Sequence, residues 1–325
     1  MEIIFGPVPS RRLGLSLGLD LVPFKTCTLD CIYCELGRTA TPVAERREYL
    51  PFSRIEEEIR NFFENPSEHP ELDFVTLSGS GEPTLNRALP RVVELVRELT
   101  STPIALLTNG TLFSDPAVRR EVAGIDLILP SLDTVSEDIF QALNRPAPGL
   151  SAAGLVEGLV QLREEFRGEI WLEILFCRGL NDHPAEIARL VSACKRIEPD
   201  RIQLNTVARP GALPSAVAVS PAALEKIRAE FGDRAEIIAS FKSTAAPPSA
   251  LSENLAAVLA TLKRRPCTAG DLEKALGMKK AETIKILDLL REKGEITARE
   301  HAGRTFYQAA ELAPNPDSQY GESAS

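Results

Sequence analysis

The sequence predicts an α/β fold with a small second domain at its C-terminal end. Six short apolar runs alternate with stretches of helical periodicity, which is typical of repeated β/α units around a parallel sheet. The runs lie at residues 15–21, 73–79, 104–110, 126–132, 170–176 and 201–207. Six units are too few for a closed eightfold barrel, so the fold is either an open, partial barrel or a doubly wound sheet.

The segments between the runs carry apolar residues three or four positions apart, which predicts amphipathic helices. Four such segments start at Ile55, Leu89, Leu155 and Ile187. The runs themselves are almost continuously apolar, as in parallel strands that helices cover on both faces. In either candidate fold the reacting groups belong at the C-terminal ends of the strands. Polar residues gather at five of these ends and are either site residues or ordinary turn residues; they lie at 78–82, 108–110, 131–133, 178–182 and from 205 onward.

A smaller domain is predicted after residue 250. Residues 243–250 are rich in small residues and proline, so they are interpreted as a linker that follows a first domain at 1–242. Residues 251–310 predict three helices and a two-stranded hairpin, the order of a winged-helix domain. Residues 311–325 are expected to be a disordered tail.

Residue types at the helix ends support this second domain. Thr268 is expected to cap a short helix that ends at Gly277, and Gly294 is expected to end the next helix. On that last helix, at about residues 280–293, Ile284, Leu287 and Leu290 are expected to share the buried face.

Composition and charge indicate an ordinary globular protein. The chain has 325 residues, of which 44% are hydrophobic and 26% charged, enough to bury a large core. Its net charge of −9 argues against a general polyanion binder, although residues 251–310 hold 11 Lys or Arg against 8 Asp or Glu. The first residues lack the apolar segment of a signal peptide, and no apolar stretch is long enough to span a membrane. We therefore expect a cytoplasmic protein without membrane contact.

Three of the six cysteines are clustered, at Cys27, Cys31 and Cys34. Without an export signal, clustered cysteines favour a metal site over disulfides. Three thiolates coordinate only three irons of a four-iron cube, so the fourth iron stays open to a ligand from outside the protein. Zinc is the alternative, but a zinc site normally needs a fourth nearby Cys or His, and His69 is the nearest histidine in the sequence. The spacing therefore favours a [4Fe–4S] cluster.

This cysteine spacing, with the aromatic Tyr33 directly before the third cysteine, resembles the radical S-adenosylmethionine (SAM) superfamily over about residues 5–242. The resemblance implies a partial barrel of six β/α units, a [4Fe–4S] cluster and SAM as cofactors, and an external electron donor such as flavodoxin or ferredoxin. In that family SAM binds the open iron and is cleaved reductively to methionine and a 5′-deoxyadenosyl radical, which removes a hydrogen atom from the substrate. The protein supplies orientation and exclusion of water.

Further positions are similar to the SAM-binding motifs of this family. Ser80-Gly81-Glu82-Pro83 resembles the GGE motif that receives the SAM amino group, with Ser80 where the family often has Gly. Ser131 and Asp133 resemble the position that contacts the ribose. The resemblance also implies a cofactor contact for Tyr33.

Three asparagines follow predicted strands, at Asn109, Asn181 and Asn205. Asn109 is expected to line the SAM pocket, and the other two to reach SAM or substrate, but each is equally well explained as the cap of a turn. Upstream, Arg11 and Arg12 either bind a phosphate or carboxylate or form surface ion pairs.

Segment 6–27 resembles a subfamily related to the tRNA wyosine-synthesis enzymes, whose bacterial members often add a helical C-terminal module. Those tRNA enzymes also use a second cluster. Cys177, Cys194 and Cys267 are too scattered to form a second three-cysteine set, which argues against the wyosine reaction itself.

Two hypotheses follow. The first is a radical SAM enzyme that acts on an RNA base, a peptide or a metabolite; the second is a cluster-containing redox sensor that binds DNA through the winged helix. The motifs beyond the cysteines favour the enzyme, because a bare sensor needs no SAM-binding set at successive strand ends. The winged helix either docks a protein or binds nucleic acid through basic residues on its third helix and hairpin; these are Lys279, Lys280, Lys285 and Arg304.

Overall fold

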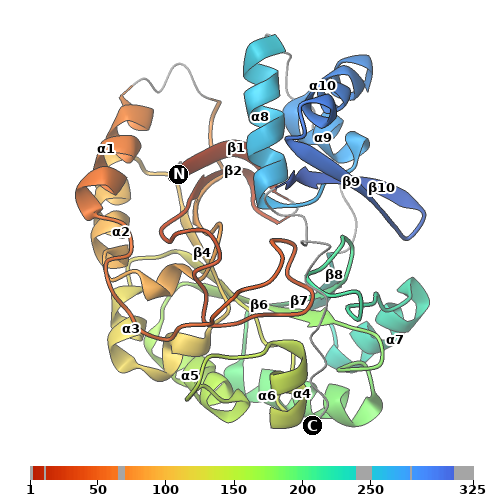
Figure 1. Cartoon of the computed structure of the whole chain (residues 1–325). Coiled ribbons are helices and arrows are strands. Elements are labelled where there is room, and N and C mark those ends of the chain that lie inside the picture. Colours follow the sequence, from red (N-terminus) through yellow and green to blue (C-terminus); the bar gives the residue numbers. More distant parts are fainter. Residues whose placement is uncertain (1–2, 11, 65–69, 239–250, 279, 311–325) are drawn as a thin grey trace, which may run out of the picture.

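The computed structural model describes residues 3–10, 12–64, 70–238, 251–278 and 280–310. The predicted linker at 243–250 and the predicted tail at 311–325 lie outside these residues. Within the described part, an eight-stranded sheet with its helices forms the larger portion, and three helices with a two-stranded hairpin form the C-terminal portion (Figure 1). The architecture is α/β, as predicted.

The eight strands of the described sheet are paired in chain order, from β1 at one edge to β8 at the other. β1 runs antiparallel to β2, and every following pair is parallel. Figure 1 shows the sheet curved, with helices on its outer side. The strands are β1 (Ile4–Ser10), β2 (Gly14–Leu19), β3 (Phe74–Leu77), β4 (Ile104–Thr108), β5 (Leu127–Pro130), β6 (Glu169–Phe176), β7 (Arg201–Thr206) and β8 (Ala235–Ile237).

The six predicted strands are β2 to β7, and the sequence prediction missed both edge strands. β1 contains Gly6 and Pro7, and its register with β2 shifts between Phe5 and Val8. Because proline cannot donate to a sheet ladder, such a segment is tolerated at an edge but carries little strand signal. β8 has three residues, too few to show a pattern. The expected six strands are therefore corrected to eight in the described sheet.

Helices connect the parallel strands and bury their apolar faces against the sheet. The four helices predicted from periodicity are α1 (Phe52–Phe63), α2 (Leu89–Leu99), α5 (Ala152–Glu165) and α6 (Pro184–Ile197); α3 (Pro116–Glu121), α4 (Glu137–Leu143) and α7 (Pro221–Phe231) complete this set. Ile55, Val92, Leu159 and Leu190 are fully buried in one core with the strand residue Leu77. This alternation brings the C-terminal ends of the parallel strands, and the loops that follow them, to one end of the sheet. None of the described helices has the length and apolar character needed to cross a membrane.

The C-terminal portion consists of α8 (Leu251–Arg264), α9 (Ala269–Leu276), α10 (Lys280–Glu292), β9 (Ile296–His301) and β10 (Arg304–Ala309), with the two strands antiparallel. It has its own hydrophobic core, in which Val258, Leu272, Leu287 and Leu290 are buried. The elements follow the predicted order, whereas the assignment as a winged helix and the domain boundaries stay predictions.

One expectation for α10 is wrong. Ile284 is 43% exposed, whereas Ile286, Leu287 and Leu290 are buried. Each residue turns a helix by about 100°, so Ile284 and Leu290 point about 120° apart and do not share a face.

A capping box starts α9. Thr268 Oγ1 accepts a hydrogen bond from Asp271 N at 3.1 Å, and Asp271 Oδ2 accepts one from Thr268 N at 3.0 Å. Burial by itself raises the pKa of Asp271, but the Thr268 N–H and the charge of Arg209 outweigh it, so the pKa lies below 3.8. A lowered pKa means that the carboxylate stabilises the fold above pH 3.8 and that this contribution is lost as the pH falls through the folded-state value.

We therefore expect Asp271→Asn to speed hydrogen exchange of the α9 amides at neutral pH, because the variant loses a charged cap. As the pH falls through the folded-state pKa, which lies below 3.8, the parent carboxylate loses its charge, so the difference between parent and variant should shrink. Hydrogen-exchange mass spectrometry of both proteins, at neutral pH and at a pH below the folded-state pKa, measures this difference. An equal difference at both pH values would contradict the assigned role of the charge.

Candidate active site

The loop that follows β2 carries the three predicted cysteines, all of them half-buried. Asp30 N donates to Asn144 O at 3.0 Å and fastens this loop to the segment after α4. Cys34 N donates to Cys31 O at 3.1 Å, which closes a turn between these two cysteines. The local fold thus holds Cys27, Cys31 and Cys34 at the C-terminal end of the first parallel strand.

Each of the three sulfur atoms has a side-chain donor beside it. Lys25 Nζ lies 3.1 Å from Cys34 Sγ, Asn144 Nδ2 lies 3.4 Å from Cys31 Sγ, and Asn109 Nδ2 lies 3.5 Å from Cys27 Sγ. Hydrogen bonds to cluster sulfurs stabilise their negative charge and tune the reduction potential. The donor set therefore fits a cluster bound through three thiolates.

Burial strongly raises the pKa of two of these thiols. It raises the pKa of Cys27 to about 12, with the charge of Glu82 as the next cause, and it raises the pKa of Cys31, with Asp133 as the next cause. A thiol that coordinates a metal is deprotonated outright, whatever its free pKa. No three His, Cys, Asp or Glu side chains of the described residues are placed to share one metal ion, and in a four-iron cube each thiolate binds a different iron.

The predicted SAM-binding segment 80–82 lies directly against the cysteine loop. Lys25 N donates to Ser80 O at 2.7 Å, and Glu82 N donates to Thr26 O at 2.9 Å. A Cβ atom at Gly81 would lie only 1.9 Å from Thr26 O. The two segments therefore approach this closely only because position 81 is glycine.

Asp20 connects this segment to the C-terminal portion. It is buried directly after β2, and its Oδ2 accepts from Ser80 N at 2.9 Å and lies 3.4 Å from Arg264 NH1 of α8. The Arg264 guanidinium also lies 3.7 Å from the centre of the Phe5 ring. Sequence analysis assigned no role to Asp20 or Arg264, because the two residues are 244 positions apart and no local pattern links them.

Glu82 is buried, and its carboxylate is engaged by protein donors. Oε1 accepts from Thr84 Oγ1 at 2.6 Å and from Thr108 Oγ1 at 2.7 Å, and Oε2 accepts from Asn109 N at 2.7 Å. Burial raises the pKa of Glu82, while these hydrogen bonds oppose the rise. The carboxylate thus ties the loop after β3 to the end of β4.

Asp133 organises a second group of side chains beside Cys31. Its Oδ2 accepts from the Tyr33 hydroxyl and from Asn144 Nδ2, the latter at 2.8 Å. Asn144 Oδ1 is buried and has no hydrogen-bond partner in the described part of the chain, so it can accept from a ligand. Residues 144–146 supported the subfamily resemblance in the sequence, but sequence analysis assigned Asn144 no role in the site.

The other predicted residues divide between the site and its support. Asn109 Nδ2 donates to Thr28 Oγ1 at 2.7 Å, which anchors the cysteine loop. Ser131 N donates to Thr108 O at 3.0 Å, beside the end of β4. Asn205 lines the cavity described next, and its amide donates to Glu173 at 3.0 Å.

Asn181 has a structural role. It is fully buried, and its side chain bonds to three backbone groups, including Cys177 N at 2.8 Å and Asp133 O at 2.8 Å. Of the two explanations offered by the sequence, the turn cap therefore holds.

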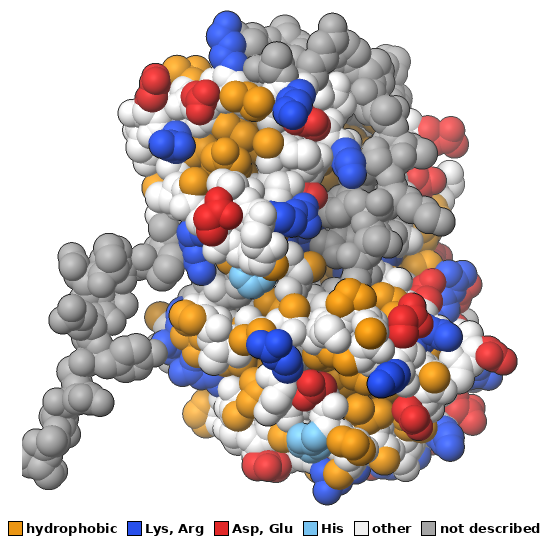
Figure 2. Space-filling model, turned by 90° about the vertical axis from the view of Figure 1, so that its right-hand side faces the viewer, with side chains coloured by type: hydrophobic (Ala, Val, Ile, Leu, Met, Phe, Trp, Pro, Cys, Tyr) orange, Lys and Arg blue, Asp and Glu red, His pale blue; other side chains and the backbone are white. Residues whose placement is uncertain are grey.

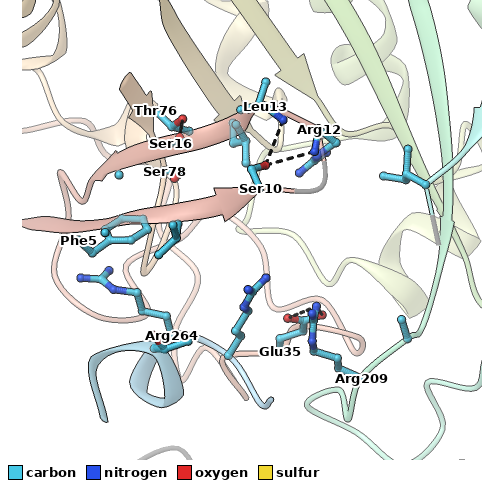
Figure 3. A pocket seen from close by; sticks show the side chains of 18 of the residues that line it. Phe5, Ser10, Arg12, Leu13, Ser16, Glu35, Thr76, Ser78, Arg209 and Arg264 are labelled. Atoms are coloured by element: carbon cyan, nitrogen blue, oxygen red, sulfur yellow. Dashed lines mark hydrogen bonds and ion pairs between the residues drawn. The ribbon is translucent and has the colours of Figure 1, made fainter. Parts of the chain in front are cut away.

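A cavity of about 760 Å³ lies between the curved sheet and α8. Cys31, Tyr33 and Cys34 line it from the cluster loop, and Ala257 and Ala260 line it from α8. Its size falls within the range of about 300–1,000 Å³ found for small-molecule sites. Figure 3 shows side chains of the β1–β2 hairpin on one side of this pocket and Arg264 on the side of α8. Two of the three clustered thiols, those of Cys31 and Cys34, thus line a cavity at the ends of the strands.

Comparisons with known proteins identify the family of this chain. The family model of the Radical SAM superfamily matches residues 21–191, more than half of the chain. The chain therefore belongs to the radical SAM superfamily and is a radical SAM enzyme, whose cofactors are a [4Fe–4S] cluster and SAM. Enzymes of this superfamily generally need an external reductant.

Among full-length relatives, a UPF0026 protein of Methanocaldococcus jannaschii is 32% identical over 320 residues, which cover 94% of this chain and 96% of that protein. A Brachyspira hyodysenteriae protein named GTPase Obg is 34% identical over 228 residues, covering 70% of this chain; the match spans only 33% of that longer protein.

Two solved structures share the fold at low sequence identity. A radical SAM methyltransferase from Sphaerobacter thermophilus has a TM-score of 0.53 and 18% identity, with 68% of this chain and 65% of that chain covered. The structure described as native anSMEcpe with bound AdoMet has a TM-score of 0.50 and 17% identity, with 78% of this chain and 70% of that chain covered. At these identities the likeness concerns the fold alone.

Proposed function

We propose that Cys27, Cys31 and Cys34 hold the [4Fe–4S] cluster and that SAM binds beside it, against segment 80–82. The observation that carries this proposal is a set of three thiols, each with its own side-chain donor, two of which line a cavity. When bound, the cluster and SAM supply a 5′-deoxyadenosyl radical that removes a hydrogen atom from the substrate. The residues of the chain bind and orient these groups and keep water away from them.

The contacts give the predicted SAM-site residues different tasks within this proposal. Gly81 lets this segment approach the cluster loop closely, and the carbonyl of Ser80 lies against that loop, where the ammonium group of SAM needs acceptors. Glu82 and Asn109 fix the shape of that loop through their hydrogen bonds. Asp133 holds Tyr33 and Asn144 beside Cys31, and it stands with Ser131 as the proposed contact of the SAM ribose.

Anaerobic reconstitution tests the proposal. The full chain should take up about four irons and four sulfides, the content of one cube. After reduction by flavodoxin or ferredoxin, the electron donors that we propose, it should convert SAM to 5′-deoxyadenosine. Stoichiometric zinc in anaerobically purified protein, with no iron after reconstitution, would overturn the cluster assignment. Iron uptake without SAM cleavage would overturn the assignment of the SAM site.

The subfamily assignment rests on segment 6–27, and it supports a reaction related to those of the wyosine-synthesis enzymes. Cys177, Cys194 and Cys267 are buried and lie after β6, within α6 and before α9, respectively. We therefore propose a reaction that uses one cluster. The candidate substrates of this reaction are an RNA base, a peptide and a metabolite.

The contacts of the C-terminal portion favour the enzyme over a DNA-binding sensor. Lys280, Lys285 and Arg304 are exposed, and Lys279 lies outside the described residues. Arg304 contacts the Thr268 hydroxyl at 3.4 Å, and Figure 2 shows basic and acidic side chains interspersed over one face of the molecule. Because α8 lines the cavity beside the cluster loop, the C-terminal elements are better explained as part of the substrate site than as a separate DNA reader.

Lys25 gives a prediction about the electronics of the cluster. Its ammonium lies 3.1 Å from Cys34 Sγ, and a positive charge there favours the reduced, more negative state of a bound cluster. We expect Lys25→Met to shift the midpoint potential to more negative values while the iron content is retained. A redox titration followed by electron paramagnetic resonance measures this shift.

Lys226→Met is the matched control. Lys226 is exposed on α7, so its substitution removes the same charge outside the cysteine loop. Equal potentials for the parent and the Lys25 variant would show that Lys25 does not act on the cluster.

A further inference from the structure

The charged residues around the cavity differ in balance from the rest of the chain. The charged side chains that line it, among the described residues, are four arginines and two glutamates, in a chain whose net charge is −9. They are Arg12, Arg209, Arg264, Arg265, Glu35 and Glu173. Four arginines against two glutamates leave an excess of positive charge in this lining, and a local excess of positive charge favours anionic ligands.

The arginines come from distant parts of the chain and are held in place by ion pairs. Arg12 follows β1 and lies 2.6 Å from Glu173 Oε2; Arg209 follows β7 and lies 3.2 Å from Glu35 Oε1. Arg264, at the end of α8, is held by Asp20 and Phe5 as described above. Figure 3 shows Arg12 and Arg264 on different sides of the pocket, with Arg209 and Glu35 paired with each other. Residues from the β1–β2 hairpin, from the loop after β7 and from α8 thus all contribute positive charge to the cavity lining.

The partial burial of these guanidinium groups increases their effect. The side chains of Arg12, Arg209 and Arg264 are 16%, 4% and 19% exposed, so water screens their charges less than it screens surface charges. A guanidinium presents five N–H donors in a planar fork that matches the oxygens of carboxylate and phosphate. Arginine is for that reason the residue most suited to binding such groups.

The arginines line the same cavity as the cysteine loop. Cys31, Cys34 and Tyr33 line it as well, so a ligand held by the arginines would lie next to the proposed cluster. On α8, small side chains at Ala257 and Ala260 leave the volume open beside Arg264.

We propose that this cavity binds a substrate through an anionic group, a phosphate or a carboxylate, with Arg12 on the sheet side and Arg264 on the α8 side. The C-terminal portion then completes the substrate site. This inference rests on the proposed function, since it assigns the substrate class of the same site.

The test uses the full reconstituted chain, saturated with SAM so that the carboxylate subsite of SAM itself is occupied. Inorganic pyrophosphate and citrate serve as probes for the phosphate and carboxylate sources, and binding is measured by anaerobic calorimetry. Arg12→Gln and Arg264→Gln should each weaken binding of the preferred probe about tenfold or more, because each variant loses charged hydrogen-bond donors to the anion. Lys263→Gln, an exposed neighbour on the same helix, should bind like the parent.

Tighter binding of pyrophosphate supports a phosphorylated substrate, and tighter binding of citrate supports a carboxylate. If neither probe binds, or if Lys263→Gln weakens binding as much as Arg264→Gln, the site is wrong. If Arg264→Gln disturbs the fold of the C-terminal portion, Arg12→Gln remains an independent test, because Arg12 lies outside that portion. If Arg12→Gln binds the probe like the parent, Arg12 and Arg264 do not form one anion site. Iron content and 5′-deoxyadenosine are measured in the same parent samples, so normal SAM cleavage without anion binding contradicts only this inference.

Discussion

Replacing Cys31 by alanine is expected to abolish cluster binding. The iron content after anaerobic reconstitution should fall from about four atoms per chain to nearly none, since the remaining two thiolates cannot hold a cube. The production of 5′-deoxyadenosine should fall with it. Iron analysis, the visible absorption of the cluster and mass spectrometry of the SAM products measure these losses.

Cys194→Ala provides the matched control. Cys194 is buried on α6 and contributes to the core beneath the sheet, so its removal tests the general cost of losing a buried thiol. The control should keep its iron, whereas Cys31→Ala should lose it while retaining the circular dichroism of the folded chain. A Cys31→Ala protein that retains four irons would show that the cluster is bound elsewhere.

The sequence allowed the interior of the sheet to be predicted but not its edges. Strands β2 to β7 are continuous apolar runs, because helices cover their outer face, and this pattern is local. β1 is interrupted by Gly6 and Pro7, and β8 is three residues long, so both depend on pairing with a neighbouring strand. Ile284 shows that a spacing pattern can also mislead. Residues three apart on a helix differ by about 60° in direction, so Ile284 and Leu290, six apart, do not share a face.

For the candidate site, motif residues could be predicted, and their partners could not. Glu82 belongs to a motif, yet its carboxylate is engaged by Thr84, Thr108 and Asn109, which sequence does not indicate. Asn144 reaches Cys31 only because a helix and a loop bring segments together that are 113 positions apart. Such contacts follow from tertiary packing, and no local pattern encodes them.

The contact between Arg264 and Asp20 changes how the C-terminal portion is understood. From the sequence, this portion was expected to be a separate module behind a linker. In the structure, one of its arginines meets the carboxylate that also holds Ser80. Binding at the proposed SAM segment and docking of α8 therefore share a residue, and a change at either is expected to affect the other.

Gly81→Ala is expected to have a large effect, because it separates the two segments that form the proposed SAM site. The added methyl group would lie 1.9 Å from Thr26 O and 2.9 Å from Val22 Cγ2. Thr26 O is a backbone atom, so no side-chain rotation relieves the clash, and the 80–82 segment must move. Its hydrogen bonds from Lys25 N and to Thr26 O are then lost or lengthened. Overpacking of this kind costs about 1–3 kcal/mol, and occasionally more.

We therefore expect Gly81→Ala to weaken SAM binding at least about tenfold, the equivalent of 1.4 kcal/mol, and to lower the iron retained after desalting, since the displaced segment no longer supports the cysteine loop. Anaerobic calorimetry with SAM and iron analysis measure the two effects. Gly270→Ala is the control, because the closest atom to an added Cβ there is 3.9 Å away and the residue lies in α9, away from the loop. If Gly81→Ala binds SAM and iron as the parent does, the close approach of residues 25–26 and 80–82 is not what forms the site, and the SAM position proposed here is wrong.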